Sequence, residues 1–166
     1  MPATVQFSES NLVGQVVTDG ITNINFGSVD DHDLNTSTYS IIRGTNSFSK
    51  YIRVLFTDTW TVISNMKFWK SSGAYKTDES ISAGFNVTYA TPDDADMRDT
   101  GIGDTPVPDA EPASNVNSAE GDSTIVYGAT GVSGYTGYIR LQTQTLVTTP
   151  TGAVTQKEFT FQYDEI

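Results

Sequence analysis

The sequence predicts an all-β fold, either an antiparallel β-sandwich or a jelly roll, formed by a single domain over residues 1–166. Apolar and polar side chains alternate with a period of two in several segments, whereas no window keeps a helical apolar period over successive turns. Thr, Val, Ile, Tyr and Phe are frequent while Leu, Glu and Lys are scarce, which is the bias of half-buried strands. A chain of 166 residues is long enough to bury one real core.

Five segments show the alternation most clearly, and each is predicted to form a strand. They are residues 50–57, 60–69, 82–90, 137–147 and 157–166. Shorter runs each predict a further strand, for about eight to ten strands in all. These runs are residues 4–7, 21–26, 39–43 and 124–128.

The same period assigns side chains to the two faces of each strand. In residues 60–69, one face is expected to carry Val62, Met66 and Phe68. The opposite face of that strand should carry Ile63, Asn65, Lys67 and Trp69. In residues 82–90, a single apolar face is expected from Ala83, Phe85, Val87 and Tyr89.

Residues 92–122 differ from the rest of the chain in composition. The segment holds four of the six prolines, shows no periodicity, and has nine acidic residues against one arginine, so it carries −8 of the net charge of −11. This composition predicts an extended or disordered acidic loop. A structureless loop of this length inside a compact domain is unusual and often functional. Two interpretations remain open: a solvated insertion, and an arm that orders on a neighbouring subunit by adding a strand to its sheet edge.

The net charge of −11 and the isoelectric point of about 4.2 argue against two classes of partner. Such a surface repels nucleic-acid phosphates and anionic membranes, so neither is expected as a partner. The chain has no cysteine, which excludes disulfides and thiolate metal sites. The first ten residues lack the basic and apolar regions of a signal peptide, and the apolar runs are too short to span a bilayer. Synthesis in a cytosol is therefore expected.

The only histidine, His32, lies in the polar stretch SVDDHDLN at residues 28–35. A transition-metal site normally uses more than one nitrogen ligand, which one histidine cannot supply. A catalytic triad also needs a nucleophile, and no G-x-S-x-G motif marks one. The glycine-rich residues 128–134 lack a Walker lysine and a following helix pattern. The sequence therefore predicts no catalytic residue and no cofactor.

Asp31, Asp33 and Asn35 have the 1-3-5 spacing of a calcium-binding loop. The sixth position, where such a loop needs glycine, is Thr36, and the twelfth, where it needs glutamate, is Ile42. Asp and Asn also cap turns with their own side chains, which explains the cluster without a bound ion. A polar turn is therefore the favoured interpretation, and a calcium site is the weaker alternative.

Aromatic side chains are the remaining candidates for binding. Trp60 and Trp69 bracket one predicted strand, while Tyr135 and Tyr138 flank glycine-rich turns. Exposed Trp and Tyr stack on sugars or anchor protein interfaces, which makes these four residues the candidates for a partner interface. The alternative interpretation is that they pack in the core and rim of the sandwich.

The stretches NMKFWKSSG at residues 65–73, YATP at 89–92 and FTFQYDEI at 159–166 carry a resemblance. They are similar to a group of small virion structural proteins encoded by tailed bacteriophages. The resemblance touches most of the chain except the first forty residues and the acidic segment. Its motifs are strands and turns, so it implies a particle component without enzymatic activity and defines no site residue.

The resemblance and the β pattern together lead us to expect a capsid decoration, or cement, protein on the outer surface of a virion. Its expected partners are the major capsid protein and copies of itself, with trimers at local threefold positions, and it would be made in the host cytoplasm. The alternative is a tail, baseplate or head-fibre component that binds host glycan or another virion protein. A carbohydrate-binding module and an enzyme are weaker alternatives.

Overall fold

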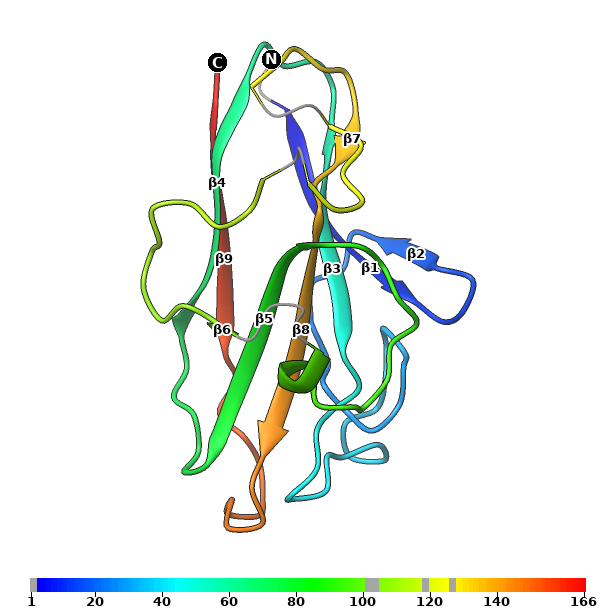
Figure 1. Cartoon of the computed structure of the whole chain (residues 1–166), viewed down its shortest axis with the longest axis vertical. Helices are drawn as coiled ribbons and strands as arrows, with labels where there is room; N and C mark the ends of the chain where they lie inside the picture. The colour runs from blue at the N-terminus through cyan, green and yellow to red at the C-terminus, as the bar shows by residue number, and fades with distance from the viewer. Residues whose placement is uncertain (1–2, 101–104, 118–119, 126–127) are drawn as a thin grey trace.

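The computed structural model describes residues 3–100, 105–117, 120–125 and 128–166. Within these ranges the chain forms nine strands and one short 3-10 helix (Figure 1). The strands are β1 (Thr4–Asn11), β2 (Val16–Asp19), β3 (Lys50–Thr57), β4 (Ile63–Ser72), β5 (Glu79–Val87), β6 (Thr105–Pro106), β7 (Gly134–Tyr135), β8 (Tyr138–Thr145) and β9 (Glu158–Glu165). The helix, η1, spans Met97–Thr100.

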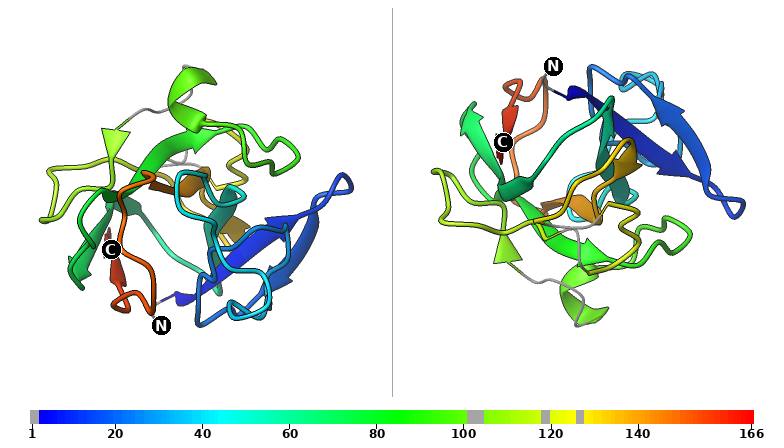
Figure 2. Two further views of the ribbon diagram at one scale, coloured as in Figure 1. Left: turned by 90° about the horizontal axis from the view of Figure 1, so that it is seen from below. Right: turned by 90° about the horizontal axis from the view of Figure 1, so that it is seen from above.

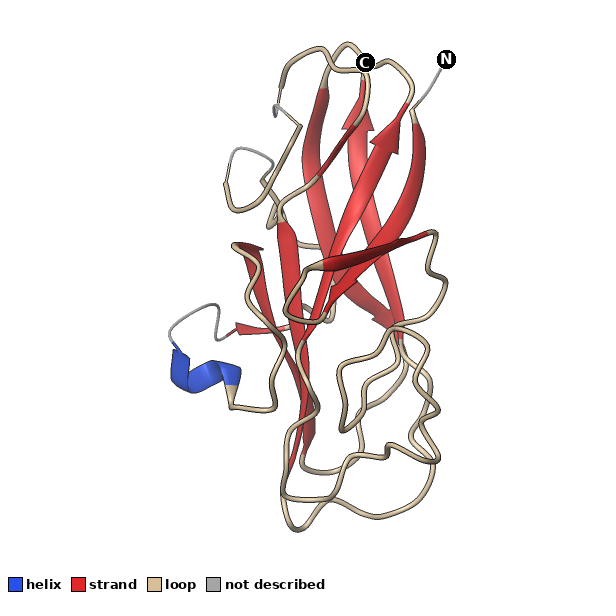
Figure 3. Cartoon of the chain, turned by 90° about the vertical axis from the view of Figure 1, so that its right-hand side faces the viewer, coloured by secondary structure: helices blue, strands red, loops and turns tan. Residues whose placement is uncertain are grey.

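The strands form two antiparallel sheets that stack in a sandwich-like arrangement (Figure 2). The large sheet has seven strands in the order β2-β1-β3-β8-β5-β6, and the short β7 pairs with β3. The small sheet consists of β4 and β9. Loops gather at one end of the molecule, below the sheets in Figure 3. The predicted all-β antiparallel fold is confirmed.

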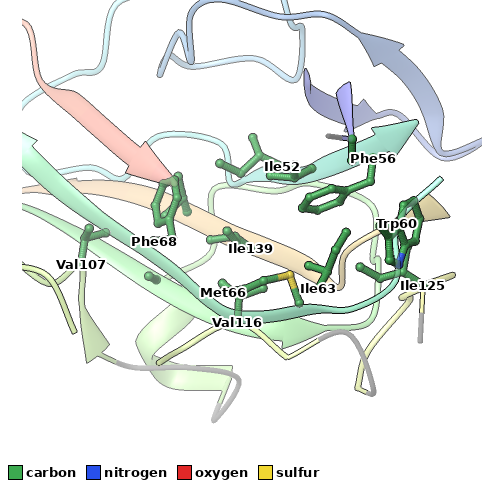
Figure 4. Close-up of a cluster of buried hydrophobic side chains, with 14 of the residues drawn as sticks. Ile52, Phe56, Trp60, Ile63, Met66, Phe68, Val107, Val116, Ile125 and Ile139 are labelled. Carbon is green, nitrogen blue, oxygen red and sulfur yellow. The ribbon is translucent and has the colours of Figure 1, made fainter. Parts of the chain in front are cut away.

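The core lies between the two sheets and uses the apolar positions of the alternating pattern (Figure 4). Phe68 of the small sheet stacks on Phe159 of the neighbouring strand, with ring centroids 5.5 Å apart. Phe56 of the large sheet meets Tyr163 of the small sheet edge to face, at 4.9 Å. Burying one such side chain contributes about 1.5–3 kcal/mol, so apolar contact holds the sheets together. The fully buried members include Ile52, Val54, Ile63, Met66, Ile139 and Leu141.

The outer face of the large sheet is buried as well, and the chain leading into the acidic segment covers it. Tyr51 of β3 and Tyr138 of β8 lie on this face, and Tyr89 packs on both rings. Further along, Asp93 accepts a hydrogen bond from Arg140 Nη2 at 3.3 Å. The start of the segment is therefore attached to the outer face of the large sheet.

Polar side chains fix the later parts of the segment on both sheets. Gln142 Nε2 donates to the carbonyl of Ala95 at 2.9 Å, and Gln142 Oε1 accepts the N–H of Met97 at 3.0 Å. At the outer edge of β4, Asn115 takes the place of a neighbouring strand. Its Oδ1 accepts the N–H of Phe68 at 2.8 Å, and its Nδ2 donates to the carbonyl of Phe68 at 2.6 Å.

The described parts of residues 92–122 therefore lie against their own chain and do not project as an arm. Apart from β6 and η1, they have no regular structure. Two lysines of β4 hold the segment by ion pairs, Lys67 with Glu111 at 2.5 Å and Lys70 with Asp109 at 2.9 Å. Among the described residues of the segment, the buried hydrophobic side chains are those of Met97, Val107 and Val116.

A bulge in β4 corrects one predicted face. Asn65 has a φ of 48°, in the left-handed region that asparagine tolerates better than most residues. The pairing of β4 with β9 shifts between Ser64 and Lys67, which is the signature of an extra residue in one strand. Ile63 is therefore fully buried, as Met66 is, although strict alternation places them on opposite faces.

A second bulge, at Asn86 in β5, corrects the other predicted face. Its φ is 57°, and the pairing of β5 with β8 shifts between Phe85 and Val87. Before the bulge, Phe85 packs on the core between the sheets. After it, Val87 and Tyr89 pack on the outer face with the tyrosines of β3 and β8. The four residues predicted to share one face are thus divided between two.

Among the weaker strand predictions, the one for residues 4–7 is confirmed, since these residues lie within β1. Residues 21–26 and 39–43 form no strand. In the run 124–128, residues 126–127 lie outside the described part of the chain, and the other three form no strand. The short strands β2, β6 and β7 follow no run that the alternation identified, because two to four residues are too few to show a period.

Candidate functional site

The β1–β2 hairpin projects from the side of the large sheet (Figure 1). It carries exposed apolar side chains. The exposed fraction is 53% for Leu12, 86% for Val13, 53% for Val16 and 38% for Val17. We call these four residues the hairpin patch. Val16 and Val17 belong to β2, an edge strand of the large sheet, and Leu12 and Val13 lie in the turn before it. Apolar side chains next to a sheet edge favour association with another protein, and monomeric proteins usually avoid them.

The turn of the hairpin holds Leu12 in an unfavourable conformation. Its φ is 65°, which costs a residue with a Cβ atom about 1–2 kcal/mol. Two hydrogen bonds fix it: the Leu12 N–H donates to Asp30 Oδ2 at 2.6 Å, and the Tyr89 hydroxyl donates to the Leu12 carbonyl at 2.6 Å. Burial raises the pKa of Tyr89, and the nearby Asp30 carboxylate raises it further, so this hydroxyl keeps its proton. The hairpin is therefore held rigidly on both sides.

A buried ion pair lies at the base of the hairpin. Glu9 and Lys50 are both fully buried, and Lys50 Nζ lies 2.9 Å from Glu9 Oε1. Glu9 pairs with Ile52 in register, so its side chain points toward the interior. Lys50 Nζ also donates to the carbonyl of Asp31 at 2.5 Å, which attaches the stretch SVDDHDLN to the ion pair. Buried charges need such additional hydrogen bonds to offset their lost hydration.

A pocket of about 300 Å³ lies between the hairpin and the stretch SVDDHDLN. Leu12 and Val16 form its apolar wall. Its polar lining residues are Asn11, Thr18, Asp30, Asp31 and His32. This volume is at the small end of the range for ligand pockets, so it suits one side chain or a small molecule.

Asn11, one of the residues that line this pocket, also has a buried side-chain oxygen without a hydrogen-bond partner. Its side-chain Nδ2 donates to Glu9 Oε1 at 2.9 Å and to Asp30 Oδ1 at 2.6 Å. Ionised carboxylates only accept hydrogen bonds, which fixes the amide with its nitrogen toward them. The residue is 4% exposed, and its Oδ1 has no partner among the residues that the structure describes. The chain therefore leaves a buried oxygen that needs a donor.

The predicted polar turn is what the structure shows around His32. Asp31 Oδ1 accepts the N–H of Asp33 at 3.1 Å, and Asn35 Oδ1 accepts the N–H of Ser37 at 3.0 Å. The oxygens expected for calcium thus serve the local turns. The described residues contain no group of three or more His, Cys, Asp or Glu side chains placed to hold a metal ion. The His32 ring lies 3.6 Å from the Asp31 carboxylate, and both side chains are substantially exposed.

The four aromatic interface candidates separate into two groups. Trp60 is 4% exposed and donates its indole N–H to a backbone carbonyl at 3.1 Å, and Tyr138 is fully buried. These two are corrected from interface candidates to packing residues, since the sandwich and its outer face enclose them. Trp69 and Tyr135 are half-buried, and the guanidinium of Arg53 lies 3.7 Å from the centre of the Tyr135 ring. Both stay candidates for an interface.

The sequence reasoning missed Glu9, Asn11 and Lys50, although a signal for them exists. Glu9 and Asn11 continue the alternation of Val5 and Phe7, so they occupy positions expected to be apolar. A carboxylate at such a position requires a buried partner. Lys50, at the start of a strand buried on both faces, is the complementary charge.

A second group of exposed apolar side chains lies at the loop end of the molecule. Ile42 is 69% exposed, Leu146 is 54% exposed and Val147 is 71% exposed. The loops that carry them touch, because the Thr145 hydroxyl donates to the carbonyl of Thr45 at 2.9 Å. We call Ile42, Leu146 and Val147 the loop patch.

The described part of the chain contains no helix with the length and apolar character needed to cross a membrane. Comparison of the chain with protein-family models, with curated proteins and with solved structures finds no match. The resemblance to phage virion proteins, and the function that it implies, stay predictions.

Proposed function

We propose that this protein is a non-enzymatic structural component of a phage particle, and specifically a capsid decoration protein that binds the outer shell. The observation that carries the proposal is the hairpin patch, formed by Leu12, Val13, Val16 and Val17. These side chains lie on a projecting hairpin whose turn is held in place by hydrogen bonds with Asp30 and Tyr89. A rigid, exposed apolar projection loses little conformational freedom when it docks on another protein.

The presence of two separate apolar patches supports a position within a lattice. The hairpin patch and the loop patch lie on different parts of the molecule, so one copy can contact two neighbours. A specific interface buries about 1,000 Å² or more, which exceeds what a hairpin tip supplies. Contacts with a shell subunit and with a second copy of this chain would together have to supply that area, and many copies add avidity. The net charge of −11 keeps such a surface away from packaged nucleic acid.

The experiment that tests the proposal is the copy number of this protein in purified particles, measured by quantitative mass spectrometry against the major shell protein. A ratio of one copy per shell subunit, or a simple fraction of it, is the expected result. A small fixed number of copies per particle would instead indicate a tail, baseplate or vertex component. Absence from particles would overturn both virion functions.

The alternative of a glycan-binding tail or fibre component has less support. Sugar recognition uses exposed aromatic faces, and Trp60 is buried while Trp69 is half-buried. A glycan array probed with the purified protein tests this alternative directly. Binding that is lost in the Trp69→Ala variant would favour it over decoration of the shell.

A further inference from the structure

The small sheet has an open edge along β9, on the side away from β4. β4 is the only strand that pairs with β9 in the described part of the chain. The backbone N–H groups of Phe68 and Lys70 in β4 donate to the acidic segment and not to β9. In an antiparallel pair, opposite residues exchange either both hydrogen bonds or neither. Phe161 and Phe159, which lie opposite Phe68 and Lys70, therefore direct their N–H and C=O groups away from β4.

The two-residue period of a strand extends this orientation to Tyr163. The bulge between Ser64 and Lys67 adds its extra residue to β4, so β9 keeps its own alternation. Among the described residues, none donates to or accepts from the outward backbone groups of Phe159, Phe161 and Tyr163. We call residues 159–163 the β9 edge. It presents an N–H and a C=O group at every second residue, which is a template for a further strand.

The β9 edge lacks the features with which proteins usually protect open edges, namely short strands, prolines, lysines or a covering segment. At the ends of the large sheet, β2 has four residues, and β6 has two and includes Pro106. The outer edge of β4 is covered by Asn115. β9 has eight residues without a proline or a lysine. Among the described strands, its edge is therefore the one best suited to receive another strand.

Aromatic side chains line the inner side of the β9 edge. Phe159, Phe161 and Tyr163 pack against the core, but all three are only half-buried. Phe7 of β1 meets Phe161 edge to face, with ring centroids 6.3 Å apart, so the large sheet continues beneath this edge. A strand added here would cover these rings with its inward side chains. Such a strand gains from apolar residues at alternate positions, because they remove apolar surface from water.

The outer side of the β9 edge is acidic at both ends. Glu158, Gln162 and Asp164 alternate with the aromatic residues and are exposed. The ammonium groups of Lys67 and Lys157 are already engaged in ion pairs with other carboxylates. Opposite charges on facing strands stabilise their pairing, and like charges destabilise it. Lys or Arg opposite Glu158 and Asp164 is therefore favoured in an added strand.

The same charges disfavour a second copy of this chain at the β9 edge. Antiparallel pairing of β9 with β9 of another copy would place Glu158 opposite an acidic residue, either Asp164 or Glu165. The net charge of −11 adds to the repulsion between two copies. The occupant that fits is a segment of a different protein with basic residues.

We propose that the β9 edge receives an extended segment of a partner protein as a third, antiparallel strand of the small sheet. The segment has apolar residues at alternate positions and a Lys or Arg at each of two positions six residues apart, opposite Glu158 and Asp164. The antiparallel direction matches every strand pair among the described residues. The inference goes beyond the proposed function, because it concerns a different surface from the hairpin patch and does not require a particle.

The test is an NMR titration of the full isotope-labelled chain with the peptide acetyl-Lys-Val-Thr-Val-Thr-Val-Lys-amide. In the free chain, amide hydrogen exchange should be slow at Thr160 and Gln162, which face β4, and fast at Phe159, Phe161 and Tyr163. Saturating peptide should slow exchange at these three residues by about ten-fold or more, because their N–H groups gain acceptors. Slow exchange there in the free chain, or no change with peptide, would overturn the proposal.

Two N-methylated peptides test whether the backbone pairs. In the proposed register the central valine lies opposite Phe161 and exchanges both hydrogen bonds with it. Methylation of that valine nitrogen removes the donor, so this peptide should not bind measurably. Methylation of a neighbouring threonine nitrogen, which faces away from β9, should leave binding unchanged. Equal binding of the two methylated peptides would overturn strand addition.

A peptide with glutamate in place of both lysines tests the charge. It should bind about ten-fold more weakly, because two favourable cross-strand pairs become repulsive. Glu158→Lys should weaken the lysine peptide and strengthen the glutamate peptide, each by about two- to five-fold. Asp33→Lys makes the same charge change at an exposed carboxylate in the stretch SVDDHDLN and should affect neither peptide. Equal effects of the two variants would overturn the choice of a basic partner.

Sedimentation of the chain alone tests the second copy as the occupant. The amides of the β9 edge should exchange equally fast at all protein concentrations. A concentration-dependent oligomer in which Phe159 and Phe161 become protected would replace the partner segment with a second copy.

The outcomes separate this inference from the proposed function. Strand addition in a protein that never enters particles would sink the proposed function and leave the β9 edge as a binding site. A protein that decorates shells while its β9 edge ignores the lysine peptide would do the reverse.

Discussion

The inner face of the large sheet is covered in two different ways, and its side chains change character between them. Under the small sheet, the face is apolar, with Phe56 and Ile139 fully buried. Toward the base of the hairpin, the cover is the irregular stretch around Asp31, and the same face carries Glu9 and Lys50. The named side chains are fully buried in both regions, but one region is held by apolar contact and the other by charge.

The difference follows from what each cover presents. A paired strand satisfies its own backbone groups and presents only side chains to the layer beneath. An irregular loop presents backbone groups that need partners, as the Asp31 carbonyl needs the Lys50 ammonium. The buried ion pair is therefore the means by which a loop is attached where no strand is available. Its position beside the hairpin links the stability of the fold to the geometry of the candidate site.

Breaking the ion pair is expected to give the largest effect. Lys50→Met leaves the Glu9 carboxylate buried without its counter-charge and the Asp31 carbonyl without its donor. The free energy of unfolding should fall by about 3–5 kcal/mol. Chemical denaturation followed by tryptophan fluorescence measures this value. A loss below about 1 kcal/mol would mean that water already hydrates the pair.

The double variant Glu9→Leu with Lys50→Met sharpens the same comparison. Replacing both charges by apolar groups removes the hydration cost that the pair carries, so the double variant should be more stable than Lys50→Met alone. The pocket should nevertheless change, because Asn11 Nδ2 loses one of its two acceptors. If the free energy of unfolding lost in the double variant equals the sum of the losses in the two single variants, the two charges do not act as a pair.

Asn115 lies at a second place where an irregular segment takes the position of a strand, and a variant of this residue tests its role there. Its amide makes two hydrogen bonds with the backbone of Phe68 at the outer edge of β4. Asn115→Ala should lower the free energy of unfolding by about 1–3 kcal/mol, because it leaves both backbone groups unpaired. Amide hydrogen exchange at Phe68 should accelerate in this variant more than at Ile139, which serves as the internal control in the large sheet. Equal protection at both positions would contradict a local role for Asn115.

The regular parts of this fold could be predicted from the sequence, and the irregular covers could not. Alternation identifies β3 and β8 because paired strands repeat every two residues. It fails beyond Asn65 and Asn86, where a single left-handed residue moves the pattern to the other face. Composition indicates that residues 92–122 lack regular structure, but it does not reveal that Val107 and Val116 reach the core. Such contacts depend on the path of the chain in space.

The candidate site was missed for a related reason. The stretch SVDDHDLN has the composition of a set of ligands, but in the structure it covers Glu9 and Lys50. The pocket depends on residues of β1, the hairpin and the stretch around Asp31, and no single stretch of sequence contains it. The hairpin itself was not identified, because its turn uses Leu12 and Gln15 in left-handed conformations where a glycine or asparagine would have signalled a turn.

A smaller effect is expected at high pH from Tyr75, beside the small sheet. Burial, followed by the carboxylates of Asp109 and Glu79, raises the pKa of Tyr75 to about 12. The unfolded chain releases this proton near pH 10, so the folded state binds more protons between pH 10 and 12. Stability from this group is complete below pH 10 and is lost as the pH rises through 12. The tyrosinate absorbance of the folded protein, compared with that of Tyr75→Phe, measures the titration.

The smallest effect on stability is expected from Val13→Ser, at the tip of the hairpin, where the side chain is 86% exposed. Substitutions at such positions change the free energy of unfolding by less than about 0.5 kcal/mol. Binding to shells should nevertheless fall by about ten-fold, the effect of losing one anchoring side chain. Val132→Ser, at an exposed valine outside both patches, should change neither quantity. If Val13→Ser keeps its stability but binds shells more weakly, the hairpin tip is assigned to binding. If Val13→Ser binds shells as the unchanged protein does, the hairpin patch is not part of the interface, and the loop patch becomes the surface to test.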